Sequence, residues 1–196
     1  MPEMSRVAQL MCRSAPWRFF AGRVVLPWAL QRSEMRGDVL EVGCGSGAMA
    51  AEVLRQFSAV RLTATDYDES MVQVARQRLS EFGSRAEVRQ ADATALPFPD
   101  ASFDAVLSFI MLHHVLQWEQ ALAEAVRVLR PGGRLVGYDL LGDGVGRILH
   151  GRERDTRLMR SAELRQVLAE LTLDDAVSDP KFGGLVARFT GRKAAA

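Results

Sequence analysis

Short apolar runs alternate along the chain with longer segments in which apolar residues recur at every third or fourth position. The apolar runs predict strands over residues 39–42, 60–65, 86–90, 103–109 and 134–138. The amphipathic segments predict helices over residues 48–57, 69–82 and 118–129. Strands that alternate with helices of this length predict an α/β fold, a doubly wound and mostly parallel sheet with helices on both faces.

Both ends of the chain depart from this alternation. Residues 161–171 predict a helix, and residues 174–178 and 185–190 predict two strands. The segment between these strands is too short for a crossover helix, so the two strands should pair antiparallel. At the other end, residues 4–31 predict two helical pieces, punctuated by prolines and rich in Trp, Phe and Arg. Such a segment packs on the core, closes over a ligand as a lid, or lies against a lipid-like surface.

The composition is that of an ordinary globular protein and changes this picture little. The 196 residues suit one domain, with 48% hydrophobic and 25% charged residues and a formal net charge of +1. This charge balance does not indicate a nucleic-acid partner. The two cysteines, Cys12 and Cys44, form no metal-ligand spacing, so we expect no metal, reduced thiols and a cytoplasmic location. No apolar run reaches the length of a transmembrane helix, and the N-terminus does not resemble a signal peptide.

Three glycines at alternating positions, Gly43, Gly45 and Gly47, lie between the first predicted strand and the helix that follows it. Glycine has no Cβ, so such a turn lets the backbone approach a nucleotide-like ligand closely. The spacing from Gly43 to Ala48 satisfies the loose dinucleotide pattern, and Asp66 follows at about the expected later position. The turn by itself leaves open which nucleotide-like ligand is bound.

Acidic residues stand where three of the predicted strands end. Right-handed crossovers bring these ends to one edge of a parallel sheet, so Glu41, Asp66 and Asp92 should face a common crevice. A carboxylate accepts hydrogen bonds from two vicinal hydroxyls at once, which favours a ribose for Asp66. Its alternative role is a helix N-cap, for which Asp68 is better placed. Asp92 is expected to accept from an adenine amino group, with a turn-forming aspartate as the alternative.

These motifs occur together and in the order seen in a known family. The matching segments are Val39–Gly47, Ala91–Val106, Leu112–Val115 and Arg127–Leu135. Over roughly residues 38–139 the chain resembles the class I S-adenosylmethionine-dependent methyltransferases. The resemblance implies a three-layer, Rossmann-like fold with seven strands, the last of them antiparallel, and S-adenosylmethionine as the cofactor.

The resemblance also implies which residues hold this donor. Glu41 would lie near the methionine amino group, Asp66 on the ribose, and Asp92 with the backbone of Ala93 on adenine. The further expected contacts are the backbone of Gly43, Cys44, Gly45 and Gly47 along the methionine tail, and Tyr67, Met71 and Ser108. Physical reasoning agrees, because three carboxylates around one crevice suit a sulfonium cation better than the pyrophosphate of a dinucleotide.

On this interpretation the whole chain is a single methyltransferase domain. Its expected parts are an N-terminal helical lid over 1–36, a donor-binding core over 38–139, a substrate-side insertion over 140–160, and a last helix with a strand pair over 161–196. The lid and the insertion are rich in arginine and should select the methyl acceptor. We expect a small, partly apolar molecule, with anionic or lipid-like acceptors as options, and peripheral membrane contact through the lid as another. Nucleic acid is disfavoured as the acceptor.

Methyl transfer is an in-line displacement, so the protein mainly aligns the donor with an O, N or C nucleophile and excludes water. A general base is needed only where the nucleophile arrives protonated. The candidates are His113, His114 and Asp139, and structural packing is the alternative role for the two histidines. Two other functions stay open, a non-catalytic adaptor that binds S-adenosylmethionine and an NAD-binding oxidoreductase.

Overall fold

The seven strands in the described part of the chain lie in one sheet. The computed structural model describes residues 26–30, 34–143 and 157–195, and the strand order is β3-β2-β1-β4-β5-β7-β6. The first five strands pair in parallel, whereas β7 runs antiparallel to both β5 and β6. The predicted α/β fold with an antiparallel last strand is therefore confirmed. The expectations for residues 1–25, 31–33 and 144–156 lie outside the described residues.

The observed elements follow the predicted order closely. The strands are β1 Gly37–Val42, β2 Val60–Asp66, β3 Ala86–Gln90, β4 Phe103–Phe109, β5 Leu129–Leu140, β6 Leu173–Lys181 and β7 Val186–Lys193. The α-helices are α3 Leu26–Leu30, α4 Ala48–Gln56, α5 Glu69–Leu79, α6 Trp118–Val128 and α8 Ser161–Glu170. The described residues also form three short 3₁₀ helices, η2 Ser80–Arg85, η3 Leu112–His114 and η4 Phe182–Gly184.

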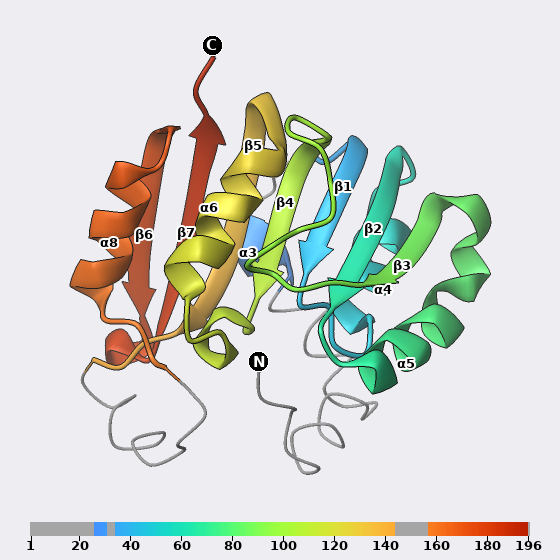
Figure 1. Cartoon of the computed structure of the whole chain (residues 1–196), viewed down its shortest axis with the longest axis horizontal. Coiled ribbons are helices and arrows are strands. Elements are labelled where there is room, and N and C mark those ends of the chain that lie inside the picture. Colours follow the sequence, from blue (N-terminus) through green and yellow to red (C-terminus); the bar gives the residue numbers. More distant parts are fainter. Residues whose placement is uncertain (1–25, 31–33, 144–156, 196) are drawn as a thin grey trace.

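Helices cover both faces of the sheet. Helices α6 and α8 pack on one face and lie in front of the sheet in Figure 1. Helices α3, α4 and α5 supply apolar side chains to the cluster on the opposite face. The parallel strands all end at the lower edge in Figure 1, which is also where η4 lies. The turns after β1, β2 and β4 therefore meet at this carboxyl edge, as right-handed crossovers require.

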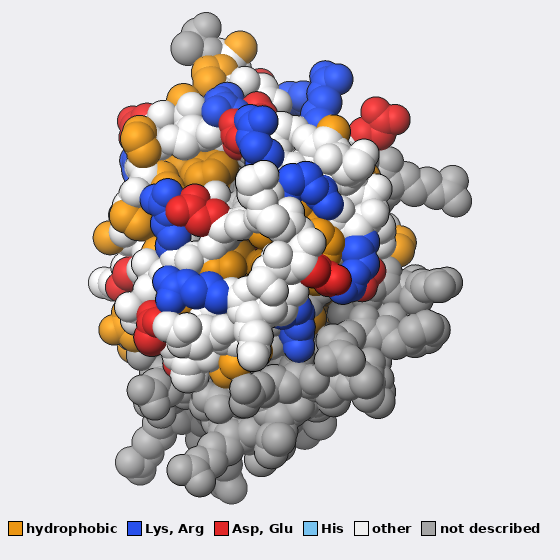
Figure 2. Space-filling model, turned by 90° about the vertical axis from the view of Figure 1, so that its right-hand side faces the viewer, with side chains coloured by type: hydrophobic (Ala, Val, Ile, Leu, Met, Phe, Trp, Pro, Cys, Tyr) orange, Lys and Arg blue, Asp and Glu red, His pale blue; other side chains and the backbone are white. Residues whose placement is uncertain are grey.

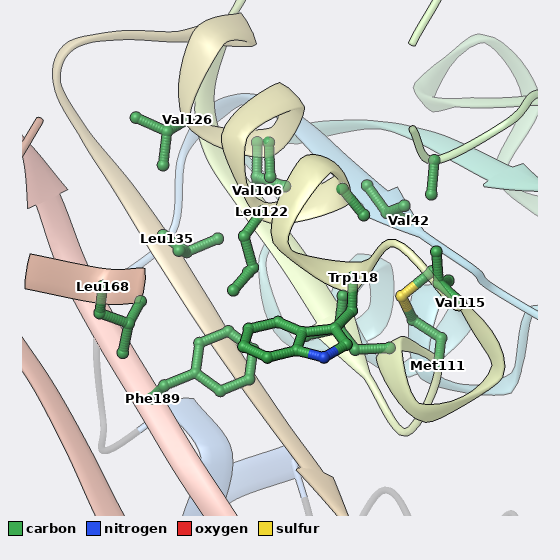
Figure 3. Packing of buried hydrophobic residues seen from close by; sticks show 14 of the residues in the cluster. Val42, Val106, Met111, Val115, Trp118, Leu122, Val126, Leu135, Leu168 and Phe189 are labelled. Carbon is green, nitrogen blue, oxygen red and sulfur yellow. The ribbon is translucent and has the colours of Figure 1, made fainter. Parts of the chain in front are cut away.

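The core on the α6 face is centred on one tryptophan. Trp118 is fully buried, and it lies beside Leu122, Leu135 and Phe189 (Figure 3). Trp118, Leu122 and Val126 are four residues apart on α6, so one side of that helix faces the sheet. This packing fixes the position of α6 and, with it, of the loop between β4 and α6.

Several predicted boundaries differ from the observed ones: β1 begins two residues earlier, and β6 and β7 each end three residues later than predicted. At two further boundaries glycine is involved. The helix predicted over 69–82 ends at Leu79 and continues as η2, inside which Gly83 has a φ of 57°. The last predicted strand of the parallel set begins at Leu129 instead of Arg134. The Pro131-Gly132-Gly133 segment lies within β5 at a register shift opposite β4, so it forms an irregularity of the strand and not a break before it.

The β3 end of the molecule carries charges of both signs. Arginine and acidic side chains are interspersed on this face (Figure 2). Arg76 pairs with Glu69 at 3.3 Å, and Arg89 pairs with Glu87 at 2.7 Å. Exposed pairs of this kind contribute little to stability. Positive and negative side chains are therefore mixed on this face, and neither sign dominates it.

Candidate functional site

The glycine turn after β1 has the backbone conformation that its sequence requires. Gly43, Gly45 and Gly47 have φ values of 68°, 51° and 72°, a region that residues with a Cβ rarely enter. A Cβ on Gly43 would lie 2.6 Å from the Cβ of Met111, so the turn packs tightly against the loop after β4. A Cβ on Gly45 would meet nothing within 4 Å. The turn is thus closed on the Gly43 side and open at Gly45.

Asp66, the last residue of β2, holds this turn in place. The backbone N–H of Gly45 donates to Oδ2 of Asp66 at 2.7 Å, and the N–H of Asp68 donates to Oδ1 at 3.0 Å. Burial raises the pKa of Asp66, and the two backbone donors oppose that shift. Asp68 itself caps α5, because its side chain accepts from the N–H of Ser70 at 2.8 Å. The capping role therefore belongs to Asp68, which leaves Asp66 at the open side of the turn.

Glu41 is a buried acid with one oxygen that no donor contacts. It is 2% exposed, and its carboxylate accepts from the backbone N–H of Ala50 at the start of α4. The second oxygen, Oε2, has no hydrogen-bond partner in the described part of the chain. Burial, with the neighbouring Asp66 carboxylate, raises the pKa of Glu41 to about 8. A buried acceptor without a donor is destabilising, so its retention points to a ligand that supplies the donor.

Cys44, in the middle of the turn, is a buried free thiol. Burial and the carboxylates of Glu41 and Asp66 raise its pKa well above the ordinary value. A thiol in such surroundings is a poor nucleophile. Its backbone N–H donates to the carbonyl of Thr65 at 2.8 Å, so Cys44 also ties the turn to β2.

The residues expected around adenine lie near the ends of β2 and β3. Tyr67 is 41% exposed, whereas Met71 is 1% exposed in the core under α5. Asp92 forms a turn with Thr94, whose backbone N–H and hydroxyl both donate to Oδ1 at 2.8 Å and 2.7 Å. Ala93 is buried. Asp92 thus has the turn-forming role, and its Oδ2 accepts no hydrogen bond from any described residue.

Ser108 lies near the end of β4, beside Val42 of β1. Its side chain is buried, and its hydroxyl oxygen has no hydrogen-bond partner among the described residues. Oε2 of Glu41 and the hydroxyl of Ser108 are therefore unpartnered polar atoms on the two central, adjacent strands. Glu41 is paired with Leu107 and Ser108 with Val42, so the two side chains point to opposite faces of the sheet near its carboxyl edge. A polar ligand at this edge could complete the hydrogen bonding of either group.

Asp139 anchors the segment that follows β4. It is fully buried, and its Oδ2 accepts from the backbone N–H groups of Met111 and Leu112 at 2.8 Å and 2.7 Å. Its Oδ1 accepts from the N–H of Leu140 at 2.7 Å and lies 2.6 Å from Nδ1 of His113. Both carboxylate oxygens are therefore occupied. In this arrangement Asp139 orients His113 and the η3 turn instead of facing an acceptor itself.

The two histidines have different surroundings although their rings lie 4.0 Å apart. His113 is 6% exposed, and a carboxylate at Nδ1 favours the tautomer with the proton on that nitrogen and the lone pair on Nε2. His114 has no such partner among the described residues. Burial and the neighbouring His113 lower the pKa of His114 to about 4, so it is neutral at pH 7.

Two features of this edge were missed by the sequence interpretation. Nη1 of Arg78 on α5 donates to both the carbonyl and the hydroxyl of Ser46 in the glycine turn, each at 2.6 Å. No local pattern singles out this arginine among those of the helix. The second feature is a line of aromatic rings that leads outward from β4 and β5. The sequence shows that the N-terminal segment is rich in Trp and Phe. It does not show which rings pack together, because the rings of the line come from distant parts of the sequence.

The described residues contain no group of three or more His, Cys, Asp or Glu side chains that could hold a metal ion. In the same ranges, no helix has the length and apolar character that a membrane span requires.

Comparisons with known proteins bear on this site. The family model described as "Methyltransferase domain" matches residues 40–137, the stretch that contains the turn, Asp66, Asp92 and the histidines. A demethylmenaquinone methyltransferase of Clavibacter sepedonicus is 39% identical over 120 residues, which are 61% of this chain and 45% of that protein. The O-methyltransferase cnsE of Penicillium expansum is 40% identical over 110 residues, 54% of this chain and 38% of that protein. The chain thus spans less than half the length of these two relatives.

Among solved structures, the PH0226 protein of Pyrococcus horikoshii OT3 matches with a TM-score of 0.79 at 18% identity, over 97% of this chain and 100% of that chain. This likeness shows the fold. The family model shows more, because it covers the segments that build the carboxyl edge. The chain belongs to the methyltransferase-domain family of class I S-adenosylmethionine-dependent methyltransferases.

Proposed function

We propose that this chain transfers a methyl group from S-adenosylmethionine to an O, N or C atom of a small, partly apolar acceptor. The observation that carries the proposal is the unpartnered oxygen of buried Glu41 beside a left-handed glycine turn that is open at Gly45. When bound, the donor supplies a methyl group on a sulfonium cation, which needs no further activation.

The residues at the edge fit this donor in chemical type. Its methionine part carries an ammonium group, which can donate to the free oxygen of Glu41. Its ribose carries two hydroxyls, and the carboxylate of Asp66 keeps acceptor capacity beyond its two backbone bonds. Oδ2 of Asp92 and the backbone of Ala93 are in the same way suited to the amino group and ring of adenine. The turn offers backbone and space at Gly45 where a side chain would otherwise stand.

The chain's own contribution to the reaction is alignment. Asp66 fixes the turn from β2, Arg78 fixes it from α5, and Gly43 packs it against Met111. Asp139 holds the next segment through two backbone N–H groups, so the turn and the η3 segment form one rigid edge. Positioning of this kind can supply on the order of 7–11 kcal/mol of barrier lowering in well-aligned reactions.

Where the acceptor arrives protonated, His113 is the better of the two candidate bases. Asp139 orients its ring and leaves Nε2 as the proton acceptor, as in the dyads that activate hydroxyl groups. His114 is a weaker base, because its pKa is lowered to about 4. Asp139 acts through His113 and is a positioning residue in this proposal.

The acceptor is proposed in general terms only. One relative is named for demethylmenaquinone and another as an O-methyltransferase, so the relatives' names support a small organic acceptor without fixing the atom that is methylated. The anionic option depends on Arg147, Arg152 and Arg154, which lie outside the described residues.

Turnover with methyl-labelled S-adenosylmethionine and fractions of a metabolite extract tests the proposal. We expect S-adenosylhomocysteine to form together with a labelled small molecule in an apolar fraction. Donor binding without turnover in any fraction would favour the non-catalytic adaptor. Binding of NAD in place of S-adenosylhomocysteine would overturn the donor assignment altogether.

A further inference from the structure

Four aromatic side chains from four separate elements form a continuous line at the carboxyl edge. The rings of Phe109 and Tyr138 have centroids 5.3 Å apart, and the ring of Tyr138 lies 5.5 Å from that of Trp28. The line continues from Trp28 to Phe182 at 6.3 Å. We call these four residues the aromatic line. Phe109 ends β4 and Tyr138 lies near the end of β5, so the line begins next to the η3 segment.

The exposure of these rings rises along the line. Phe109 and Tyr138 are 7% and 3% exposed, Trp28 is half-buried, and Phe182 is 74% exposed. Phe182 is the most exposed of the large hydrophobic side chains in the described residues. A single exposed hydrophobic side chain is common on protein surfaces, but this one lies at the end of a line of rings that continues into the core.

Phe182 also stands where the backbone favours another residue. Phe182, Gly183 and Gly184 have φ values of 52°, 65° and 81°, three left-handed residues in succession. Glycine or asparagine adopts this conformation more readily than phenylalanine, whose bulk makes it strained there. The turn between β6 and β7 would therefore form more easily with Gly or Asn at this position. The fold does not explain the phenylalanine, and its only ring contact among the described residues is with Trp28.

Trp28 is held in place so that it can serve as a fixed surface. The guanidinium of Arg188 lies over its ring at 5.6 Å, and Nη1 of Arg188 donates to its backbone carbonyl at 3.2 Å. Arg188 is itself paired with Asp179 of β6 at 2.7 Å. These contacts fix one side of Trp28 and tie α3 to the β6–β7 pair. The aromatic line is thus rigid at Trp28 and open to solvent at Phe182.

We propose that Trp28 and Phe182 form the binding surface for a flat aromatic ring of the methyl acceptor. Their ring planes are inclined at 48°, and an aromatic ligand can meet them in the offset or edge-to-face arrangements that aromatic pairs favour. The line leads from this surface to the ends of β4 and β5, where Phe109 and Tyr138 share an apolar cluster with Cys44 of the glycine turn. The inference rests on the proposed function for its biological meaning, but the binding surface can be tested without methyl transfer.

The test uses two probes with the same carbon skeleton, the planar aromatic 2-naphthol and its puckered, saturated counterpart decahydro-2-naphthol. Their dissociation constants are measured by ligand-observed NMR titration of the full chain, alone and with S-adenosylhomocysteine. The proposal predicts that 2-naphthol binds at least fivefold more tightly than the saturated alcohol. Equal affinities would overturn the aromatic preference and point to a general apolar surface instead.

Phe182→Asn removes the ring at a position where the backbone suits asparagine. Its melting temperature should equal or exceed that of the wild type, because the left-handed strain is relieved. Its affinity for 2-naphthol should fall at least fivefold. Val177→Ser is the matched control, since Val177 is an exposed apolar residue of β6 outside the aromatic line. Unchanged 2-naphthol binding in Phe182→Asn, or an equal loss in Val177→Ser, would overturn the proposal.

Two further measurements keep the outcome interpretable. Phe182→Leu retains an apolar side chain, so it should lose the preference for 2-naphthol over the saturated alcohol even if the asparagine variant folds poorly. The affinity for S-adenosylhomocysteine should be the same in all three variants. Failure of the wild type to bind S-adenosylhomocysteine would refute the proposed function, whereas unaltered naphthol binding in the variants refutes only the acceptor surface.

Discussion

The backbone N–H of Gly45 donates a 2.7 Å hydrogen bond to Oδ2 of Asp66, which joins the turn after β1 to the end of β2. Gly45 is the position where the turn is open, and Asp66 is the acid expected on the ribose. One contact therefore couples two parts of the proposed donor site that are 21 residues apart in the sequence.

Replacing Asp66 by alanine should weaken binding of S-adenosylhomocysteine by roughly 10- to 100-fold, about 1.4–2.8 kcal/mol. The change removes the charge-assisted bonds proposed to the ribose and frees the N–H of Gly45. Isothermal titration calorimetry measures the effect. Asp68→Ala is the matched control, because Asp68 caps α5 and should affect stability without changing this affinity. Equal affinities in wild type and Asp66→Ala would remove Asp66 from the donor site.

Because of Glu41, the free energy of unfolding should fall as pH rises. Its pKa is raised from an ordinary value of about 4.3 to about 8 in the folded chain. Between these values the folded state binds more protons than the unfolded state, so the free energy of unfolding decreases with pH, by at most about 1.4 kcal/mol per pH unit. Asp66 contributes with the same sign, because burial raises its pKa as well.

The affinity for the cationic donor should instead rise with pH, because the positive charge of the donor favours ionised Glu41. Urea unfolding and donor titrations at pH 5, 6, 7 and 8 measure both effects. Glu41→Gln should flatten both dependences, because the amide does not titrate. If Glu41→Gln keeps the full wild-type pH dependence of stability and of donor affinity, another group is responsible for both.

Asp139→Asn should lower the free energy of unfolding by about 3 kcal/mol. The amide places an NH₂ group among donors that now point at a carboxylate, including the N–H groups of Met111 and Leu112. Asp100→Asn is the comparison, since its ion pair with Arg127 involves an aspartate that is 77% exposed. That pair should contribute less than about 1 kcal/mol. Similar stability losses in the two variants would contradict the anchoring role of Asp139.

His113 and His114 should differ in their effect on turnover once an acceptor is known. His113→Gln should lower kcat by about 10²–10⁴ for an acceptor that must be deprotonated, which is the usual contribution of a general base. His114→Gln should lower it by less than about tenfold. A larger loss in His114→Gln would reverse the assignment.

Much of the fold was predictable because the signals are local. The apolar runs predicted β2, β3 and β4 to within about one residue at either end, and the short segment between the last two strands predicted their antiparallel pairing. The strand start predicted after Pro131-Gly132-Gly133 was wrong, because residues that break a helix can also form an irregularity inside a strand. Only pairing with β4 decides between the two, and that pairing is not a local property.

The site was predictable in position more than in detail. Strand ends meet at one edge by topology, so Glu41, Asp66 and Asp92 could be grouped from the sequence. The occupancy of Asp139, and the side-chain turn that Asp92 forms with Thr94, depend on exact distances. The aromatic line could not be predicted from the sequence for another reason. Trp28, Tyr138 and Phe182 come from elements that meet only after the sheet has formed.

The central claim is that the open glycine turn receives the methyl donor, and a pair of glycine substitutions tests it most directly. Gly45 and Gly132 have φ values of 51° and 76°, and a Cβ on either would meet nothing within 4 Å. Gly45→Ala and Gly132→Ala should therefore destabilise the chain by similar amounts, about 1 kcal/mol each. Calorimetric titration with S-adenosylhomocysteine should show wild-type affinity in Gly132→Ala and at least a tenfold loss in Gly45→Ala. Wild-type affinity in Gly45→Ala would contradict the account.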